Sequence, residues 1–198
     1  MTRLSLERAL ASAITAAPAL LGCVLARRTK GGLRIARIVE TEAYPPDDPA
    51  CHAFRGPTRR NGAMFGQRGS AYVYRIHRSF CFNVVAGRVG SGEAVLVRAV
   101  EPVDGLALME QARERSSVGR RAPRGYDLTN GPGKLCQALD IDLSLNGIDL
   151  LRSGADSPLE LLPGSRVETI ATTSRIGISV AKAAKLRFVI RRSPWTSR

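Results

Sequence analysis

The stretch "LRIARIVETEAYPPDDPACHAFRG", Leu33–Gly56, predicts a strand followed by a loop. Leu33–Tyr44 alternates apolar residues with polar and charged ones, as a partly exposed strand does, and two prolines then break the pattern. In a regular strand, Glu40, Glu42 and Tyr44 project from one face. The end of a strand holds the backbone fixed while its side chains reach into a cleft, so Glu42 is a candidate catalytic group.

The two glutamates have a second interpretation, as solvated surface acids that neutralise nearby arginines. For Glu40 alone this second interpretation is favoured, whereas Glu42 lies directly before the aromatic residue and the proline break. Arg98 raises a related question, because it lies inside the apolar strand Ala94–Val100, where an unpaired guanidinium would be costly. It therefore needs a carboxylate or a phosphate as its partner. Asn83 is either a turn former or a buried polar group that discriminates between ligands.

Ser70–Val85, "SAYVYRIHRSFCFNVV", predicts a β-hairpin with a polar tip. Tyr72, Tyr74, Phe80 and Phe82 share one parity within it. Such an aromatic cluster is most often part of a core. The arginines between the rings also favour stacking on nucleobases, with the cations on the phosphates. Both interpretations can hold for different members of the cluster.

The remaining segments predict a mixed fold in one domain, residues 1–198. Strands and helices alternate without βαβ regularity, so we expect an α+β fold with a largely antiparallel sheet. The other expected elements are an N-terminal helix through residue 17 (about Leu4–Ala17) followed by a strand, a helix over Asp104–Arg115 with Val103, Leu106 and Met109 or Leu108 turned inward, a short helix from Asn130 through Leu139, and late strand material over Ile176–Ile190.

Charge is the unusual property of the composition. The chain has 30 Lys and Arg against 17 Asp and Glu, a formal net charge of +13. Pro49–Gly92 contains seven arginines and no carboxylate, and no acid follows Glu168. Two acid-free runs in a small domain favour a polyanionic partner, either nucleic acid or an anionic membrane face.

The cysteines and histidines argue against a zinc-finger site, and the N-terminal segment argues against an export signal. The four cysteines show no C-x-x-C pair, and with two histidines no zinc-finger spacing can be assembled. We expect free thiols in a reducing cytoplasm. The uncharged run Ala9–Ala26 superficially resembles an export signal, but Pro18 interrupts it and a strand follows directly, so we expect none.

Together these segments resemble the alkyladenine (3-methyladenine) DNA glycosylase family, the vertebrate-type enzyme with bacterial members. The resemblance spans almost the whole chain from about Ala17 onward, in family order. Its motifs are "RIVETEAY" with the following His52, "NGAMFGQRGSAYVYRIHRSFCFNVV", "AVLVRAVEPVDGL", "LTNGPGKLCQALDID", "SRIGIS" and "RRSPW".

The resemblance implies roles for the residues that match these motifs. Glu42 matches the carboxylate that binds and deprotonates the attacking water, and Arg98 matches the arginine that helps to hold both. Tyr44 matches the ring that stacks on one face of a flipped base. His52 matches the residue on the opposite face, whose backbone N–H contacts the base edge. Tyr74 matches a further wall of the pocket.

Asn83 matches the asparagine that excludes guanine by clashing with its exocyclic amine. Thr58, Met64 and Lys134 fall where the family touches the DNA backbone or neighbouring bases. His77 stands at the hairpin tip, where the family usually carries a tyrosine that intercalates into the duplex. Imidazole is smaller than the tyrosine ring. We therefore expect His77 to wedge into the duplex more weakly, and the protein to release DNA faster.

The resemblance implies a curved, mostly antiparallel sheet with flanking helices and a protruding hairpin, residues 70–85, that contacts DNA. It implies a monofunctional glycosylase that flips alkylated or deaminated purines out of duplex DNA and hydrolyses the N-glycosidic bond with a Glu-activated water. No cofactor, metal or membrane is expected. We expect a monomer in the cytoplasm whose partner is double-stranded DNA.

Two other classes of function fit parts of the sequence. The first is a nucleic-acid-binding module without catalysis, in which Glu42 is structural. The second is a cysteine hydrolase that uses Cys51 or Cys81 with His52 or His77. The second is disfavoured because adjacent residues of an extended segment, such as Cys51 and His52, point to opposite sides.

Overall fold

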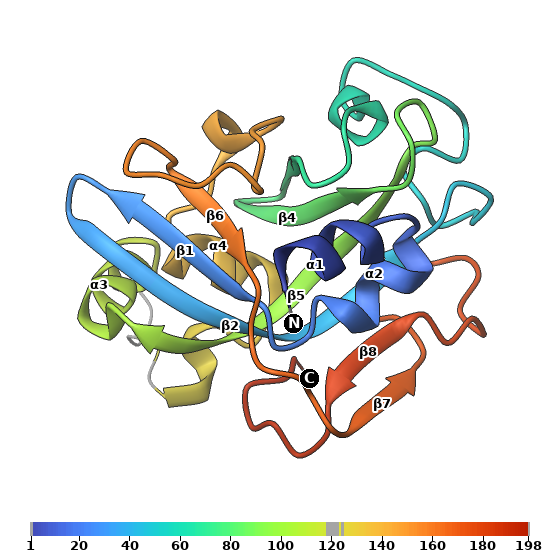
Figure 1. Cartoon of the computed structure of the whole chain (residues 1–198). Helices are drawn as coiled ribbons and strands as arrows, with labels where there is room; N and C mark the ends of the chain where they lie inside the picture. The colour runs from blue at the N-terminus through green and yellow to red at the C-terminus, as the bar shows by residue number, and fades with distance from the viewer. Residues whose placement is uncertain (1, 118–122, 124, 198) are drawn as a thin grey trace.

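The computed structural model of the chain describes residues 2–117, 123 and 125–197 (Figure 1). The predicted α+β fold in one domain is confirmed. The elements are α1 (Arg3–Ala9), α2 (Ala13–Ala19), β1 (Val24–Thr29), β2 (Gly32–Tyr44), the 3-10 turn η1 (Gly62–Phe65), β3 (Ala71–Ile76), β4 (Ser79–Ala86), β5 (Glu93–Asp104), α3 (Leu106–Arg115), η2 (Gly125–Leu128), α4 (Pro132–Ala138), η3 (Leu143–Leu145), β6 (Leu159–Leu162), β7 (Ile170–Thr173) and β8 (Arg187–Ile190).

The described strands form one antiparallel sheet built around β2. The strand order is β3-β4-β5-β2-β1-β6, and β8 pairs with both β2 and β7. β2 is 13 residues long and pairs with β5 through most of its length. Along its other edge, Gly32–Arg37 pairs with β1 and Glu40–Glu42 pairs with β8. Figure 1 shows the result: β7 and β8 take the edge of β2 where β1 has ended.

A β-bulge on β2 decides which of its residues face the hydrophobic core. Val39 is the extra residue, because Ile38 pairs with Val100 and the residue after Val39 pairs with the neighbouring Ala99. Before the bulge, Ala36 and Ile38 face the core. After it, Thr41 and Ala43 do, and the Thr41 hydroxyl donates to the Ala17 carbonyl of α2 at 2.7 Å. The bulge therefore exchanges the two faces of the strand.

The prediction that Glu40, Glu42 and Tyr44 share a face is met only through this bulge. In a regular strand these side chains would have the same parity as Ile38, so they would point into the core with it. The prediction of a partly exposed strand is wrong in this half of β2, where every residue from Ile38 to Ala43 is buried. The acids are enclosed because other elements cover both faces of the strand.

A matching irregularity on β5 directs Arg98 away from the core. Thr41 pairs with Val97, whereas the residue before it pairs with Ala99, so Arg98 is the extra residue on this strand. Val95 and Val97 belong to the core, and Arg98 lies on the opposite face. Two bulges on adjacent strands thus bring a carboxylate pair and an arginine to one side of the sheet.

The N-terminal segment forms two helices where the sequence predicts one. α1 ends at Ala9, and α2 begins after Ser12, whose hydroxyl accepts the Thr15 N–H at 3.2 Å as an N-cap. Glu93 adds a second cap, since its Oε2 accepts the Ala13 N–H at 2.7 Å. The small buried face of α2, made by alanines, allows the helix to pack closely on β2 and β5, and α1 and α2 cross in front of β5 in Figure 1.

The hairpin of β3 and β4 is confirmed, but its aromatic residues lie on two faces. Tyr72 pairs with Asn83 and Tyr74 with Cys81, so these four side chains share one face. The two phenylalanines pair with the intervening residues of β3 and pack in the main core. The phenylalanines are therefore the core members of the cluster and the tyrosines lie on the other face, because the two-residue turn fixes a register that places equal parity on opposite faces.

Two later predictions also need correction. Val103 and Leu106 are 61% and 49% exposed, and Met109 is the residue that α3 buries in the core. The late strand material lies at Ile170–Thr173 and Arg187–Ile190, and the segment between these two strands is irregular. Among the described helices, none is long and apolar enough to cross a membrane.

Candidate active site

A cavity of about 500 Å³ lies on the face of the sheet opposite the main core. β3, β4 and β5 contribute the cavity-facing residues of their strands. The loop between β2 and η1 and the irregular segment after β7 close two of its sides. Its lining includes Tyr44, His52, Met64, Tyr72, Tyr74, Ile76, Asn83, Arg98 and Ile176.

Aromatic rings form one wall of the cavity. The His52 ring lies 4.6 Å from the Tyr74 ring, edge to face, and the Tyr74 ring lies 5.4 Å from that of Tyr72. The Tyr72 hydroxyl and His52 Nδ1 are hydrogen-bonded at 2.9 Å. Burial, and then the positive charge of Arg60, lowers the pKa of His52, so the ring is neutral at pH 7. Burial raises the pKa of both tyrosines, which keeps the wall uncharged.

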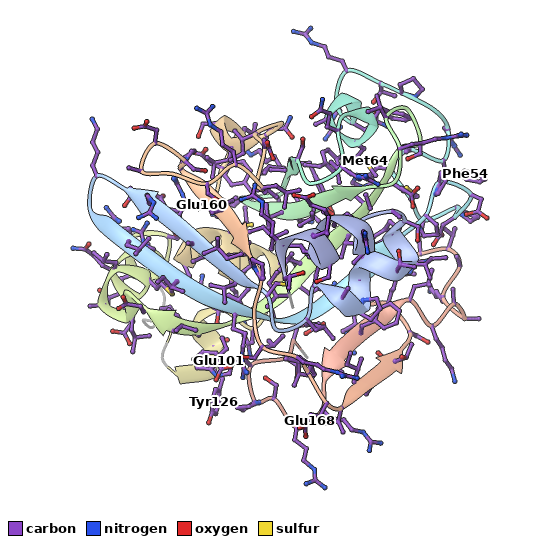
Figure 2. All side chains as sticks on the ribbon, in the orientation of Figure 1. Phe54, Met64, Glu101, Tyr126, Glu160 and Glu168 are labelled. Carbon is purple, nitrogen blue, oxygen red and sulfur yellow. The ribbon has the colours of Figure 1, made fainter. Side chains whose placement is uncertain are left out.

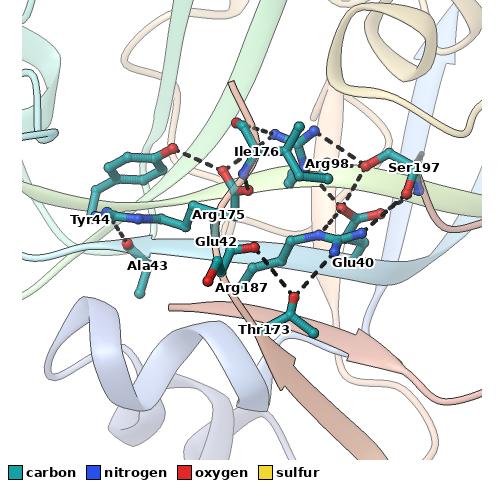
Figure 3. A network of polar contacts seen from close by, with 11 residues as sticks. Glu40, Glu42, Ala43, Tyr44, Arg98, Thr173, Arg175, Ile176, Arg187 and Ser197 are labelled. Carbon is teal, nitrogen blue, oxygen red and sulfur yellow. Dashed lines mark hydrogen bonds and ion pairs between the residues drawn. The ribbon is translucent and has the colours of Figure 1, made fainter. Parts of the chain in front are cut away.

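Tyr44 connects the cavity to the buried acids (Figure 3). Its hydroxyl donates to Glu42 Oε2 at 2.8 Å. The Arg175 guanidinium lies 4.7 Å from the ring centroid and donates to the Ala43 carbonyl at 3.0 Å. Arg175 also pairs with Asp48 at 2.5 Å. Burial, and then the neighbouring Glu42 charge, raises the pKa of Tyr44, so the hydroxyl stays a donor.

Glu42 is completely buried, and every contact of its carboxylate is a donor. Oε1 accepts the Ile176 N–H at 2.8 Å, and Oε2 accepts from Tyr44 and from Arg98 Nη1 at 3.3 Å. Three donors compensate the loss of water around the carboxylate. Glu42 itself does not line the cavity, but Tyr44, Arg98 and Ile176, which hold it, all do.

Glu40 is the clearest correction to the sequence analysis. The interpretation as a solvated surface acid is wrong, because Glu40 is 0% exposed. Its carboxylate pairs with Arg98 Nε at 2.9 Å and with Arg187 Nε at 2.7 Å. The predicted need of Arg98 for a partner is met by carboxylates, since this arginine bridges Glu40 and Glu42 and also donates to the Ile176 carbonyl at 3.3 Å.

The amino-acid sequence matches a known protein family over most of its length. The family model for methylpurine-DNA glycosylase matches residues 7–194. The chain belongs to the methylpurine-DNA glycosylase family. It is 46% identical over 182 residues to a protein of Carboxydothermus hydrogenoformans, covering 90% of each chain, and 48% identical over 195 residues to one of Methanoculleus marisnigri, covering 93% of each. A third relative, from Francisella tularensis, is 42% identical over 189 residues and 93% of each chain. All three carry the name of candidate 3-methyladenine DNA glycosylases.

The remaining pocket residue predicted from the family resemblance is Asn83. It is buried on β4, and its side-chain amide donates to the Tyr72 carbonyl across the hairpin at 2.9 Å. That bond fixes the amide plane at the cavity wall, so its position is set by backbone geometry.

The residues expected to touch DNA in this glycosylase family lie in different settings. Thr58 is exposed in the loop before η1, where Asn61 Oδ1 accepts its N–H at 2.6 Å. Met64 is 2% exposed and lines the cavity, inside a small hydrophobic cluster with Cys51 and Tyr72. Figure 2 shows Met64 nearer to β4 than the exposed Phe54 of the same segment.

Two further candidate DNA contacts belong to segments that meet in the fold, since the Ser79 hydroxyl of β4 donates to the Gly133 carbonyl of α4 at 3.0 Å. Lys134, at the start of α4, is partly exposed and is held by Asp127 and by Asn130 Oδ1, the latter at 2.8 Å. His77 is exposed at the hairpin tip, outside the residues that line the cavity. Ile76, next to it, does line the cavity and is 42% exposed.

Sequence analysis missed four residues of the polar network in this family member: Arg175, Ile176, Arg187 and Ser197 (Figure 3). They come from the acid-free tail, where a solvated basic face is the simple expectation. The motif "SRIGIS" contains Arg175 and Ile176, whereas Arg187 and Ser197 lie outside "RRSPW", one on each side of it. Nothing in their local pattern indicated burial beside two carboxylates.

The four cysteines are free and buried. Cys51 Sγ donates to the Tyr44 and Gly92 carbonyls, at 3.7 and 3.6 Å, while His52 bonds Tyr72. Burial raises the pKa of Cys51 and of Cys81. A thiol with a raised pKa and no histidine partner is a poor nucleophile, which argues against the cysteine hydrolase.

Proposed function

We propose that the protein is a monofunctional DNA glycosylase that flips an alkylated purine into the cavity and hydrolyses its N-glycosidic bond with a water activated by Glu42. Membership in the methylpurine-DNA glycosylase family makes it a hydrolytic N-glycosylase of alkylation repair. The observation that carries the mechanism is a buried carboxylate, held by three donors, directly behind an aromatic cavity. Deaminated purines are further candidate substrates.

The cavity suits a flipped, positively charged base. A base inside a duplex cannot be reached, so the nucleotide must be extruded at a cost of a few kcal/mol. N3- or N7-alkylation makes the purine cationic, and neutral tyrosine rings attract a cation by about 0.5–2 kcal/mol per contact. Tyr44 stacks on one face of the base, with His52 and Tyr74 on the other side. Asn83 excludes a guanine amine.

The chemistry needs one water beside Glu42. The water binds where Arg98 Nη1 and the Ile176 carbonyl meet the cavity, and Glu42 accepts its proton as the oxygen attacks C1′. The C1′–N bond breaks and its electron pair leaves with the purine, so a cationic alkylpurine departs as a neutral base. The negative charge of Glu42 stabilises the oxocarbenium character that C1′ gains. The products are free base and an abasic site.

Arg98 restrains the water and the acid together. Its Nη1 contacts both Glu42 and the Ile176 carbonyl, and its Nε is held by Glu40. A fixed guanidinium costs no reorganisation during the reaction, which is how preorganised charges favour catalysis. No lysine adjoins Glu42 among its contacts in the described residues, in keeping with a water nucleophile and no strand cleavage.

A base-release assay tests this proposal. Duplex DNA methylated with dimethyl sulfate is incubated with the wild type, Glu42→Gln and the exposed control Glu168→Gln, and free methylpurines are quantified. We expect Glu42→Gln to lose at least ~100-fold in rate, because it removes the general base, while affinity for abasic DNA stays within about twofold. Glu168→Gln keeps wild-type release. Retained turnover in Glu42→Gln would assign the base to another residue.

The lesion range is read from the same assay. Duplexes that carry 3-methyladenine, 7-methylguanine, hypoxanthine or ethenoadenine are compared at one enzyme concentration. Cationic lesions are expected to be released fastest, because they combine a good leaving group with cation–π attraction. No aspartate or glutamate that could protonate the purine is among the described residues that line the cavity. The release of hypoxanthine is therefore expected to be slower. Faster release of hypoxanthine would contradict charge-based selection.

A further inference from the structure

We propose that Glu40, together with Arg187, is a positioning residue that holds Arg98 and Glu42 in one buried array of zero net charge. This inference rests on the proposed function, since it gives these side chains a part in the same reaction. Neither residue lines the cavity, so neither is proposed to touch the base.

The Glu40 carboxylate is saturated with donors. Oε1 accepts from Arg98 Nε at 2.9 Å, Arg187 Nε at 2.7 Å and the Ser197 hydroxyl at 2.6 Å. Oε2 accepts the Ser197 N–H. A carboxylate with this many donors, in a position with no exposed surface, is fixed in orientation. It therefore fixes the arginine that it shares with Glu42.

Arg187 supplies the balancing charge. Its backbone pairs with Glu42 in the β2–β8 register, and its side chain runs to Glu40. Nη1 donates to the Thr173 hydroxyl and Nη2 to the Ser197 carbonyl, both at 3.1 Å. The array thus has two carboxylates, Glu40 and Glu42, and two guanidinium groups, Arg98 and Arg187. Removing one member leaves an uncompensated charge in a medium of low polarity.

Within the described parts of the chain, the other charged or titratable groups around Glu42 do not alter this balance. On β2, Tyr44 is neutral, and on β4, Cys81 is a neutral thiol whose pKa is raised mainly by burial. From the segment after β7, Arg175 reaches the same region but pairs with Asp48. α2, which packs on the other face of β2, contains no titratable side chain. The sign of the net charge near Glu42 therefore depends on Glu40 and Arg187.

Opposite substitutions should move the pH profile in opposite directions. Glu40→Gln leaves an excess positive charge in the array, which disfavours uptake of a further proton, so the acid limb of kcat/KM moves to lower pH. Arg187→Gln leaves an excess negative charge and moves the acid limb to higher pH. Each shift is expected to be on the order of one pH unit. The double variant is neutral again, and its acid limb returns toward the wild-type position.

The measurement is base release from dimethyl-sulfate-treated duplex DNA between pH 4.5 and 8, with abasic-DNA affinity and thermal unfolding recorded for each variant. Arg187→Lys is the matched control, because it keeps the charge and is expected to leave the acid limb in place. Glu40→Gln should also lower kcat by about tenfold with KM nearly unchanged, since Arg98 loses its anchor.

Three outcomes separate the possibilities. Opposite shifts that cancel in the double variant support the proposal. Lower activity or thermal stability in all variants, with one unchanged acid limb, overturns it and leaves Glu40 a purely structural residue. If Glu40→Gln does not fold, Arg187→Gln and the double variant still decide the sign. Failure of the proposed function would look different, because the wild type itself would release no base.

Discussion

At the scale of single residues, the Tyr44 hydroxyl links the cavity wall to the proposed catalytic acid. It donates to Glu42 at 2.8 Å while its ring lines the cavity. Tyr44→Phe keeps the ring and removes one of three donors to the carboxylate. We expect kcat to fall about threefold to tenfold with little change in KM, because stacking survives while the acid is less well held. Tyr44→Leu, the matched control for the ring, should raise KM as well. A KM effect in Tyr44→Phe equal to that in Tyr44→Leu would contradict separate roles.

The His52 ring gives a pH-dependent prediction at the same scale. Burial lowers its pKa below the usual 6.5, so it is neutral at pH 7 and becomes a cation only as the pH falls through the lowered value. A cationic His52 repels a cationic purine, so binding should weaken below pH 6.5. Binding is measured in the Glu42→Gln background, which removes that carboxylate from the titration. Adding His52→Gln should abolish the pH step; a step that persists would assign it elsewhere.

At the scale of elements, the β3–β4 hairpin ends in a strained two-residue turn. Ile76 pairs with Ser79, and His77 between them has a positive φ of 49°, which glycine adopts more easily. His77→Gly should therefore raise thermal stability by about 0.5–1 kcal/mol and weaken binding to abasic DNA, because the wedge is lost. His77→Tyr should tighten that binding. Unchanged affinity in both variants would show that the tip does not enter the duplex.

At the scale of the whole molecule, the arginines of the two acid-free runs differ in exposure and in ion pairing. In Pro49–Gly92 all seven arginines are exposed, and none has an ion pair within the described parts of the chain: Arg55, Arg59, Arg60, Arg68, Arg75, Arg78 and Arg88. In the tail, Arg175 and Arg187 are instead paired with carboxylates beside the cavity. The first run is the expected phosphate-binding surface, and part of the second belongs to the candidate active site.

This difference predicts how salt affects DNA binding. Arg55→Ala combined with Arg59→Ala should reduce the slope of log K against log salt concentration by about two, because each phosphate contact contributes about 0.9. Lys30→Ala, in the β1–β2 turn at the far end of the sheet in Figure 1, should leave the slope unchanged. Titrations of an undamaged duplex from 50 to 300 mM salt measure both. Equal slopes in all variants would place the DNA elsewhere.

The amino-acid sequence by itself determined the fold class and the hairpin, and it indicated the acid-free basic runs and, through the family resemblance, the candidate acid, arginine and aromatic residues of the site. Those features follow from local periodicity, charge and motifs that are continuous in the chain. Tertiary structure alone decided that Glu40 is buried with Arg187 and Ser197 of the tail as its partners, and that Ile176 contacts Glu42 while Arg175 packs on Tyr44. The reason is physical: the bulges at Val39 and Arg98 reverse the side-chain alternation, and β8, which is far from β2 in the sequence, pairs with the edge of β2 through tertiary contacts.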